Sequence, residues 1–256
     1  MAKETTKIIL CGCCGKMGSA VTKTVEAREN IQIAAGVDIK ECMTLPYPVF
    51  ASFDEVVCKA DVIVDFSNPG TLPGLLDYAE NNHMPAVLCA TGYTQEQIAL
   101  IEKASEKTAI FRSGNMSLGI NLISELAKAA AKVLGETFDV EIVEAHHNQK
   151  LDAPSGTAIM LENAVEEGLN YKPEIVYDRH SVSQKRDKKE IGIHSIRGGT
   201  IVGEHEIIFA GNDEIVKISH TALSKNVFAS GAVDAAIYMC GKETGLFDMN
   251  DVIKNK

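Results

Sequence analysis

The densest group of reactive side chains in the sequence lies between Glu144 and Ala158. His146, His147 and Lys150 occur there on a polar stretch, and Ser155-Gly156-Thr157 opens an expected helix. A histidine can transfer a proton near neutral pH, and a lysine ammonium attracts anions. Backbone N–H groups at the start of a helix also bind carboxylates. The segment therefore predicts a site where an anionic substrate is protonated.

Each of these side chains, taken alone, also has a purely structural explanation. Ser155 can serve only as the N-cap of the helix, His147 can be a hydrogen-bonded loop histidine, and Lys150 can be a solvated cation. Their clustering in a chain that also carries a dinucleotide-binding pattern favours the functional interpretation.

That pattern is a glycine loop near the start of the chain. Gly12, Gly15 and Gly18 follow an apolar run and precede a stretch with helical periodicity. Glycines permit a tight turn and the close approach of a pyrophosphate, and the helix start offers free N–H groups. Asp38 follows about twenty residues later, at the end of the second expected strand, where a carboxylate binds ribose hydroxyls. Because the spacing is G-x-x-G-x-x-G, a strand–helix turn without a ligand stays the alternative.

The cysteines of this loop do not form a recognisable metal site. Cys11, Cys13 and Cys14 lie close together, but zinc sites need four ligands and no second cysteine pair follows at a suitable spacing. We therefore expect no metal. An odd total of seven cysteines in 256 residues indicates reduced thiols in the cytoplasm rather than a disulfide framework.

Strands and helices are expected to alternate through the first half of the chain. The expected strands cover residues 7–11, 31–37, 60–65, 86–89 and 109–111, and the expected helices cover 19–29, 74–81 and 95–107. This alternation implies right-handed crossovers and a parallel sheet with helices on both faces.

The pattern changes after about residue 120. Helices are expected over 119–134, 154–168 and 228–241, and strands over 139–145, 190–197, 204–210 and 214–221, the last three antiparallel to one another. The predicted fold is α/β, a Rossmann-like doubly wound sheet plus a smaller α+β domain. We expect a dinucleotide-binding domain over 1–118, a substrate-binding and oligomerisation domain over 119–227, and a C-terminal helix over 228–256 that returns to the first domain.

Charge and hydropathy exclude several partners. A net charge of −10 disfavours binding to nucleic acid or to an anionic membrane. No apolar run approaches the ~18 residues of a membrane span, and the polar start lacks the apolar stretch of a signal peptide.

The segment from Glu144 to Ala158 resembles the E-A-H-H-x-x-K-x-D-A-P-S-G-T-A signature of the 4-hydroxy-tetrahydrodipicolinate (dihydrodipicolinate) reductase family. The glycine loop resembles that family's G-x-x-G-[RK]-M-G. The resemblance extends over nearly the whole chain. Further segments that resemble family motifs are Asp65-Phe66-Ser67, Ser113 to Asn121, Ser195 to Gly199 and Val202 to His205.

The resemblance implies reduction of 4-hydroxy-tetrahydrodipicolinate, or its dehydrated form, to tetrahydrodipicolinate and water, in diaminopimelate and lysine synthesis, with NADH, NADPH or both as cofactors. It implies that His146 and Lys150 supply protons and that His147, Gly156 and Thr157 bind the substrate carboxylate. It also implies a cytoplasmic homotetramer joined through the substrate domain. The implied cofactor-binding residues are Gly12, Cys13, Cys14, Gly15, Lys16, Met17, Asp38, Cys89, Ala90, Thr91, Ser113, Gly114, Asn115 and Met116.

The sequence departs from the family pattern in three places. Cys89-Ala90 replaces Gly-Thr, Gly114 and Met116 replace Pro and Phe, and Ile39 replaces an arginine that many members carry. Asp38 without that arginine favours NADH, whereas nearby lysines favour the 2′-phosphate of NADPH. We therefore expect both cofactors to be used, with NADH at least as good at moderate salt.

Two other functions remain to be distinguished. A Rossmann dehydrogenase with a cysteine nucleophile, such as a semialdehyde dehydrogenase, would use Cys89, although no histidine lies near it in the sequence. A sensor module would bind NAD(P) without chemistry, and it would have no use for His146 and Lys150.

Overall fold

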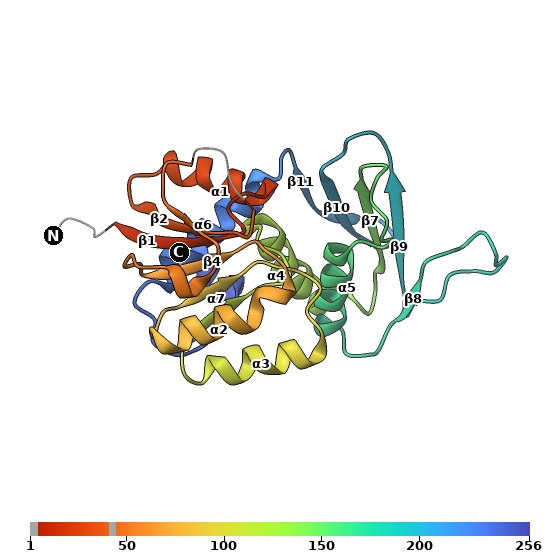
Figure 1. Ribbon diagram of the computed structural model, residues 1–256. Helices are drawn as coiled ribbons and strands as arrows, with labels where there is room; N and C mark the ends of the chain where they lie inside the picture. The colour runs from red at the N-terminus through yellow and green to blue at the C-terminus, as the bar shows by residue number, and fades with distance from the viewer. Residues whose placement is uncertain (1–4, 41–44) are drawn as a thin grey trace. The chain divides into compact units, whose positions relative to one another are not determined.

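The computed structural model describes residues 5–40 and 45–256 (Figure 1). The chain forms two compact units. One contains the residues up to Ser117 together with Lys225–Lys256, and the other contains Leu118–Ser224. Among the described residues, no helix is long and apolar enough to cross a membrane.

The first unit is built on a parallel sheet. Its strands are β1 (Thr6–Cys11), β2 (Ile31–Val37), β3 (Val49–Phe50), β4 (Val62–Asp65), β5 (Ala86–Leu88), β6 (Ala109–Arg112) and β12 (Gly245–Phe247). They lie in the order β12-β6-β5-β4-β1-β2-β3, and every neighbouring pair is parallel. The strand order reverses between β1 and β4, and ligands of such sheets bind at the carboxyl ends of the strands at this point.

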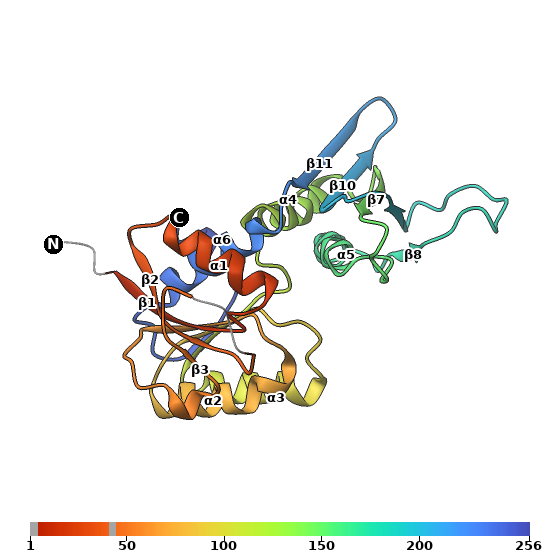
Figure 2. The ribbon, with the colours of Figure 1, turned by 45° about the horizontal axis from the view of Figure 1, so that its top comes forward.

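Helices cover both faces of this sheet. They are α1 (Lys16–Glu26), α2 (Leu72–Asn81), α3 (Gln95–Ser105), α6 (Asn226–Met239) and α7 (Met249–Lys254), with short 3₁₀ turns at Phe53–Glu55 and Pro69–Thr71. Figure 2 shows α1 and α6 on one face and α2 and α3 on the other. A capping box between Thr94 and Gln97 fixes the start of α3.

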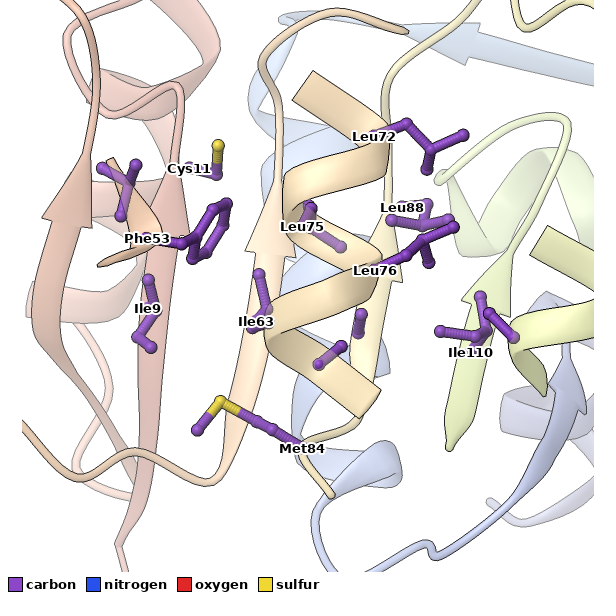
Figure 3. Packing of buried hydrophobic residues seen from close by; sticks show 14 of the residues in the cluster. Ile9, Cys11, Phe53, Ile63, Leu72, Leu75, Leu76, Met84, Leu88 and Ile110 are labelled. Carbon is purple, nitrogen blue, oxygen red and sulfur yellow. The ribbon is translucent and has the colours of Figure 1, made fainter. Parts of the chain in front are cut away.

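The apolar residues of the strands and of α2 form the core of the first unit (Figure 3). Leu72, Leu75 and Leu76 lie three and four positions apart, so they share one face of α2, and they pack over strand residues such as Ile63 and Ile110. Burial of each such side chain contributes about 1.5–3 kcal/mol. This packing holds the strand ends, and therefore the loops that follow them, in fixed positions.

The second unit is a mixed sheet with two helices on one face. Its strands are β7 (Asp139–His146), β8 (Glu174–Val176), β9 (Glu190–Arg197), β10 (Gly203–Ala210) and β11 (Ile215–Ala222), and its helices are α4 (Leu118–Leu134) and α5 (Gly156–Gly168). The strand order is β11-β10-β7-β9-β8. Alternate strand residues such as Ile142, Ile193 and Phe209 pack with apolar residues of both helices.

The structure confirms the predicted fold class and corrects one strand arrangement. β10 and β11 form the expected antiparallel pair, but β9 pairs in parallel with β7 and does not neighbour β10. The expectation that the last three strands are mutually antiparallel is therefore wrong. The reason is that α5 lies in the connection from β7 to β9, so the chain returns to the same end of the sheet before β9 begins.

Candidate active site

The glycine loop follows β1 and leads directly into α1. Gly12 adopts φ +78°, and a Cβ there would lie 2.8 Å from backbone atoms of Phe66 and Ser67. Gly15 is the N-cap of α1 and makes no side-chain cap hydrogen bond. Only glycine fits at Gly12, and the first N–H groups of α1 are available for an anion. The loop therefore has the tight glycine turn and the helix start that the sequence predicted, and its binding of a pyrophosphate stays a prediction.

Asp38 follows β2 at the edge of a cavity of about 410 Å³. Its carboxylate accepts one hydrogen bond from the backbone N–H of Cys14, at 3.0 Å, and another from that of Lys40, also at 3.0 Å. Gly12, Gly15, Ile39 and Lys40 line the same cavity. The carboxylate is therefore held in one orientation where a ribose could meet it, while Lys16 is an exposed residue at the start of α1.

The thiols of the glycine loop do not point to catalysis. Cys13 is buried, a Cβ at Gly36 would meet its Sγ at 2.5 Å, and burial raises its pKa to about 11. Cys14 is disulfide-bonded, so the expectation that the thiols are all reduced is wrong at this position. The Sγ atoms of these two cysteines and a carboxylate oxygen of Asp38 lie within 4.8 Å of one another, but this group does not offer two thiolates to a metal.

A second cavity, of about 370 Å³, lies at the ends of β4, β5 and β6. Met17, Phe66, Ser67 and Phe228 contribute to its lining, and Phe66 and Ser67 also line the Asp38 cavity. The structure brings together here the whole group of residues predicted for the nicotinamide side, namely Cys89, Ala90, Thr91, Ser113, Gly114, Asn115 and Met116.

Cys89 does not fit the alternative role of a nucleophile. Burial, and secondly the carboxylate of Asp65, raises the pKa of its thiol well above the usual value. A reactive cysteine instead needs an environment that favours the thiolate. The cysteine-dependent dehydrogenase is therefore disfavoured by the surroundings of this residue.

The histidine–lysine segment lies in the second unit, at the carboxyl end of β7. Glu144 and His146 are two positions apart on the strand, so both side chains lie on the same face of the sheet. Nδ1 of His146 lies 2.5 Å from Oε2 of Glu144. Glu144 is fully buried, and both its oxygens accept hydrogen bonds from the guanidinium of Arg197, at 2.8 and 2.7 Å. The register of β7 and β9 places His146 opposite Arg197.

The loop after β7 carries the predicted lysine. Nζ of Lys150 lies 2.9 Å from Oδ2 of Asp152, and this contact lowers the pKa of Asp152. His147 is half-buried, and its Nδ1 has no hydrogen-bond partner among the described residues. The loop therefore presents a cation and a histidine directly after the buried pair of Glu144 and His146.

The loop then enters α5, whose first residues are Gly156 and Thr157. Ser155 is buried as the N-cap, and its Oγ accepts the N–H of Ala158 at 3.1 Å. Gly156 is exposed and Thr157 is half-buried. The sequence correctly placed the polar helix start, where N–H groups and the helix dipole favour an anion.

Sequence reasoning gave no role to several residues of this site. Arg197 binds Glu144, and His205 on β10 lies 3.2 Å from Oγ of Ser155 and stacks edge-on against His146, with ring centroids 5.1 Å apart. The two-residue spacing of Glu144 and His146 on an expected strand was an available signal for their contact. Arg197 and His205 stood in quoted motifs, but only the strand pairing shows what they touch.

The burial of His205 should make the stability of the fold depend on pH. Burial, and secondly the neighbouring His146, lowers its pKa from 6.5 to about 4. Protonation of His205 is therefore less favourable in the folded state than in the unfolded state. The contribution of neutral His205 to the free energy of unfolding is complete above pH 6.5 and is lost as the pH falls toward 4. We expect a loss on the order of 3 kcal/mol in the free energy of unfolding over that window. Denaturant unfolding between pH 7.5 and 4 should show a smaller slope for His205→Gln and an unchanged slope for the exposed His180→Gln. Equal slopes in wild type and His205→Gln would contradict the assignment.

Two family models match the chain on either side of residue 118. Dihydrodipicolinate reductase, N-terminus, matches residues 6–116, and dihydrodipicolinate reductase, C-terminus, matches residues 119–253. The chain belongs to the dihydrodipicolinate reductase family. The resemblance stated from the motifs is confirmed.

Relatives and solved structures agree with this family. The 4-hydroxy-tetrahydrodipicolinate reductase of Clostridium novyi (strain NT) is 49% identical over 98% of this chain and 99% of its own. That of Caldanaerobacter subterraneus subsp. tengcongensis is 47% identical over 97% of this chain and 98% of its own. The dipicolinate-bound dihydrodipicolinate reductase of Paenisporosarcina sp. TG-14 matches with a TM-score of 0.79 at 25% identity, over 96% of this chain and 99% of its own. The apo scyllo-inositol dehydrogenase of Lactobacillus casei, at 14% identity and a TM-score of 0.57, shares the fold, covering 100% of this chain and 90% of its own.

Proposed function

We propose that this chain uses NADH or NADPH to reduce 4-hydroxy-tetrahydrodipicolinate to tetrahydrodipicolinate and water, or its dehydrated form to tetrahydrodipicolinate, in diaminopimelate and lysine synthesis. The observation that carries the proposal is the site at the end of β7. There a histidine held by a buried carboxylate precedes a lysine-bearing loop and the polar N-terminus of α5. Membership of a family of such oxidoreductases supports it.

The proposed roles follow from the chemistry of each group. A bound nicotinamide supplies hydride from its C4 atom. His146 and Lys150 deliver and exchange the proton, since both are groups that can donate one at the pH of the cell. His147 and the backbone N–H groups of Gly156 and Thr157 hold a substrate carboxylate, with support from the positive end of the α5 dipole.

We assign the cofactor to the first unit. Residues 12–17 fit the pyrophosphate, Asp38 fits the adenine ribose, and the cavity of about 370 Å³ fits the nicotinamide side. The direct test follows absorbance at the reduced-nicotinamide band with freshly generated 4-hydroxy-tetrahydrodipicolinate. Steady oxidation of either cofactor is expected. Cofactor binding with no oxidation would favour the sensor.

Cofactor choice provides a second test of these assignments. The fixed carboxylate of Asp38 can accept hydrogen bonds from both ribose hydroxyls of NADH, and it repels the 2′-phosphate of NADPH. Lys16 and Lys40 are nearby exposed cations that would offset this repulsion. We expect Asp38→Ala to change the ratio of kcat/KM for the two cofactors at least ~10-fold in favour of NADPH, because hydrogen bonds to charged groups contribute roughly 1.5–3 kcal/mol. Lys16→Ala should change the ratio in the opposite direction.

Two further variants sharpen this comparison. Asp38→Asn removes the charge but keeps an acceptor oxygen for one of the two backbone N–H groups, so it separates repulsion from loss of loop structure. Asp77→Ala removes an exposed carboxylate on α2 and should leave the ratio unchanged. The ratios should be measured at two ionic strengths, because salt screens the lysine contribution. A strong NADPH preference that Lys16→Ala does not alter would contradict the assignment.

Assembly and location belong to the same proposal. We expect a homotetramer joined through Leu118–Ser224. The sheet face opposite α4 and α5 carries Val143, Ile196, Ile208 and Ile215, of which Ile196 and Ile215 are 51% and 62% exposed. The strand register places charged residues between them, with Val143 opposite Glu206 and Ile208 opposite Lys217, so this face offers both apolar and ionic contacts to a second copy. The homotetramer and the cytoplasmic location both stay predictions.

A further inference from the structure

One buried carboxylate, that of Glu144, contacts several other groups of the site at the end of β7. Oε2 of Glu144 accepts from Nδ1 of His146 and from Arg197, while Oε1 accepts from the other guanidinium nitrogen of Arg197 and, at 3.2 Å, from the backbone N–H of Ser155. No part of Glu144 is exposed to solvent. The same side chain therefore touches both the histidine and the start of α5.

The surroundings decide the charge of this carboxylate. Burial by itself would raise the pKa of Glu144, but hydrogen bonds from Arg197, Ser195 and His146 outweigh burial and hold its pKa at about 2. Glu144 is therefore ionised over the whole range in which a histidine titrates. An ionised carboxylate only accepts hydrogen bonds, so Nδ1 of His146 must carry the proton that it donates.

The other ring nitrogen of His146 is then the atom that exchanges a proton. In the neutral ring Nε2 has no proton, and in the charged ring Nε2–H is the acid that can be given away. Space around Nε2 is kept by Gly203, where a Cβ would lie 3.2 Å from this nitrogen. A side chain at residue 203 would cover the atom that the reaction needs.

We infer that Glu144, ionised and held by Arg197, is a positioning residue that fixes the Nδ1–H tautomer of His146, directs Nε2 to the substrate and anchors the carboxylate-binding start of α5. The inference rests on the proposed function for its effect on the reaction. The tautomer itself is a property of the free protein. Other charged or titratable groups around His146 are Arg197 on β9, His205 on β10, Lys150 and Asp152 in the loop, and His220 on β11 beside His205.

The first measurement needs no variant. Two-bond ¹⁵N–¹H correlation spectra of the imidazole rings in the free protein report which nitrogen is protonated, and loss of the signal in His146→Ala assigns it. For the neutral His146 ring, we expect the Nδ1–H tautomer. The Nε2–H tautomer in the wild-type protein would overturn the inference, whether or not the protein shows reductase activity.

The second measurement compares two glutamates that each pair with an arginine. In Glu144→Gln the side-chain NH₂ can donate to Nδ1, so His146 should change to the Nε2–H tautomer. The value of kcat should fall on the order of 10²–10⁴-fold, as expected when a catalytic histidine is held in the wrong tautomer. The pH profile of kcat/KM should shift to lower pH, because an anion beside the imidazolium is lost. Glu190→Gln breaks the contact with Arg179 at 2.6 Å and serves as the matched control.

These outcomes distinguish the positioning role of Glu144 from the proposed reductase function. An altered tautomer in Glu144→Gln, and in no other variant, together with the loss of kcat, supports the positioning role. An unaltered tautomer and an unshifted pH profile in a folded Glu144→Gln protein would show that Glu144 is only structural. An Nδ1–H tautomer in a wild-type protein without reductase activity would leave the Glu144 contact standing and remove the proposed function instead.

Discussion

Replacing His146 or Lys150 by alanine is expected to lower kcat by about 10²–10⁴-fold each, the usual effect of removing a positioned acid or base. The structure explains why the fold should survive both changes. Without His146, Glu144 keeps its paired hydrogen bonds to Arg197, so no unpaired buried charge remains. Without Lys150, the freed carboxylate is that of Asp152, whose side chain is 57% exposed.

The controls for this test lie on the same domain. His180→Ala and Lys172→Ala remove exposed residues of the same types and should leave kcat unchanged. His147→Ala should mainly raise KM for the substrate, because its proposed role is to bind a carboxylate in both the ground and transition states. Steady-state kinetics of the five variants, with circular dichroism to verify folding, gives the comparison. Unchanged kcat in both His146→Ala and Lys150→Ala would remove the proposed mechanism.

The sequence predicted the bounds of two of the longer strands most accurately. β2 and β9 have the expected bounds, because a continuous or alternating apolar run both forms the strand and marks its ends. β3, β8 and β12 were not predicted, since segments of two or three residues are too short to show any periodicity. Helix α1 begins at Lys16 and not at residue 19, because the glycine loop itself supplies its N-cap.

The site was predicted through residue types and only partly through contacts. His146, Lys150 and the start of α5 could be identified from the local sequence, because each carries its own chemistry. The bond between Glu144 and Arg197 depends on residues 53 positions apart. It required the parallel register of β7 and β9, and that register was hidden as long as β9 was expected to pair with β10. Long-range strand pairing has no local signature, so the positioning residue could be recognised only in the folded chain.

The backbone geometry of the glycine loop should determine both the stability of the fold and the binding of the cofactor. A Cβ at Gly12 would lie 2.8 Å from backbone atoms of Phe66 and Ser67 at φ +78°, and a Cβ at Gly18 would lie 2.4 Å from the carbonyl oxygen of Gly12. Backbone cannot move aside as a flexible side chain does. We expect Gly12→Ala and Gly18→Ala each to lower the free energy of unfolding by roughly 1–3 kcal/mol, measured in urea without cofactor. Gly12→Ala carries in addition the strain of a left-handed alanine, about 1–2 kcal/mol.

Gly15 supplies the matched control within the same loop. Its φ is −82°, and among the described residues a Cβ there would meet only the carbonyl oxygen of Gly12, at 3.3 Å, so Gly15→Ala should change the free energy of unfolding by less than ~1 kcal/mol. Because Gly15 lines the Asp38 cavity, the same variant should still weaken cofactor binding, measured as the Kd from fluorescence of bound NADH. Gly18 does not line that cavity, so its effect on the Kd should follow from displacement of the loop. A Gly12→Ala protein with wild-type stability and wild-type Kd would show that the loop can relax and that its glycine geometry does not determine binding.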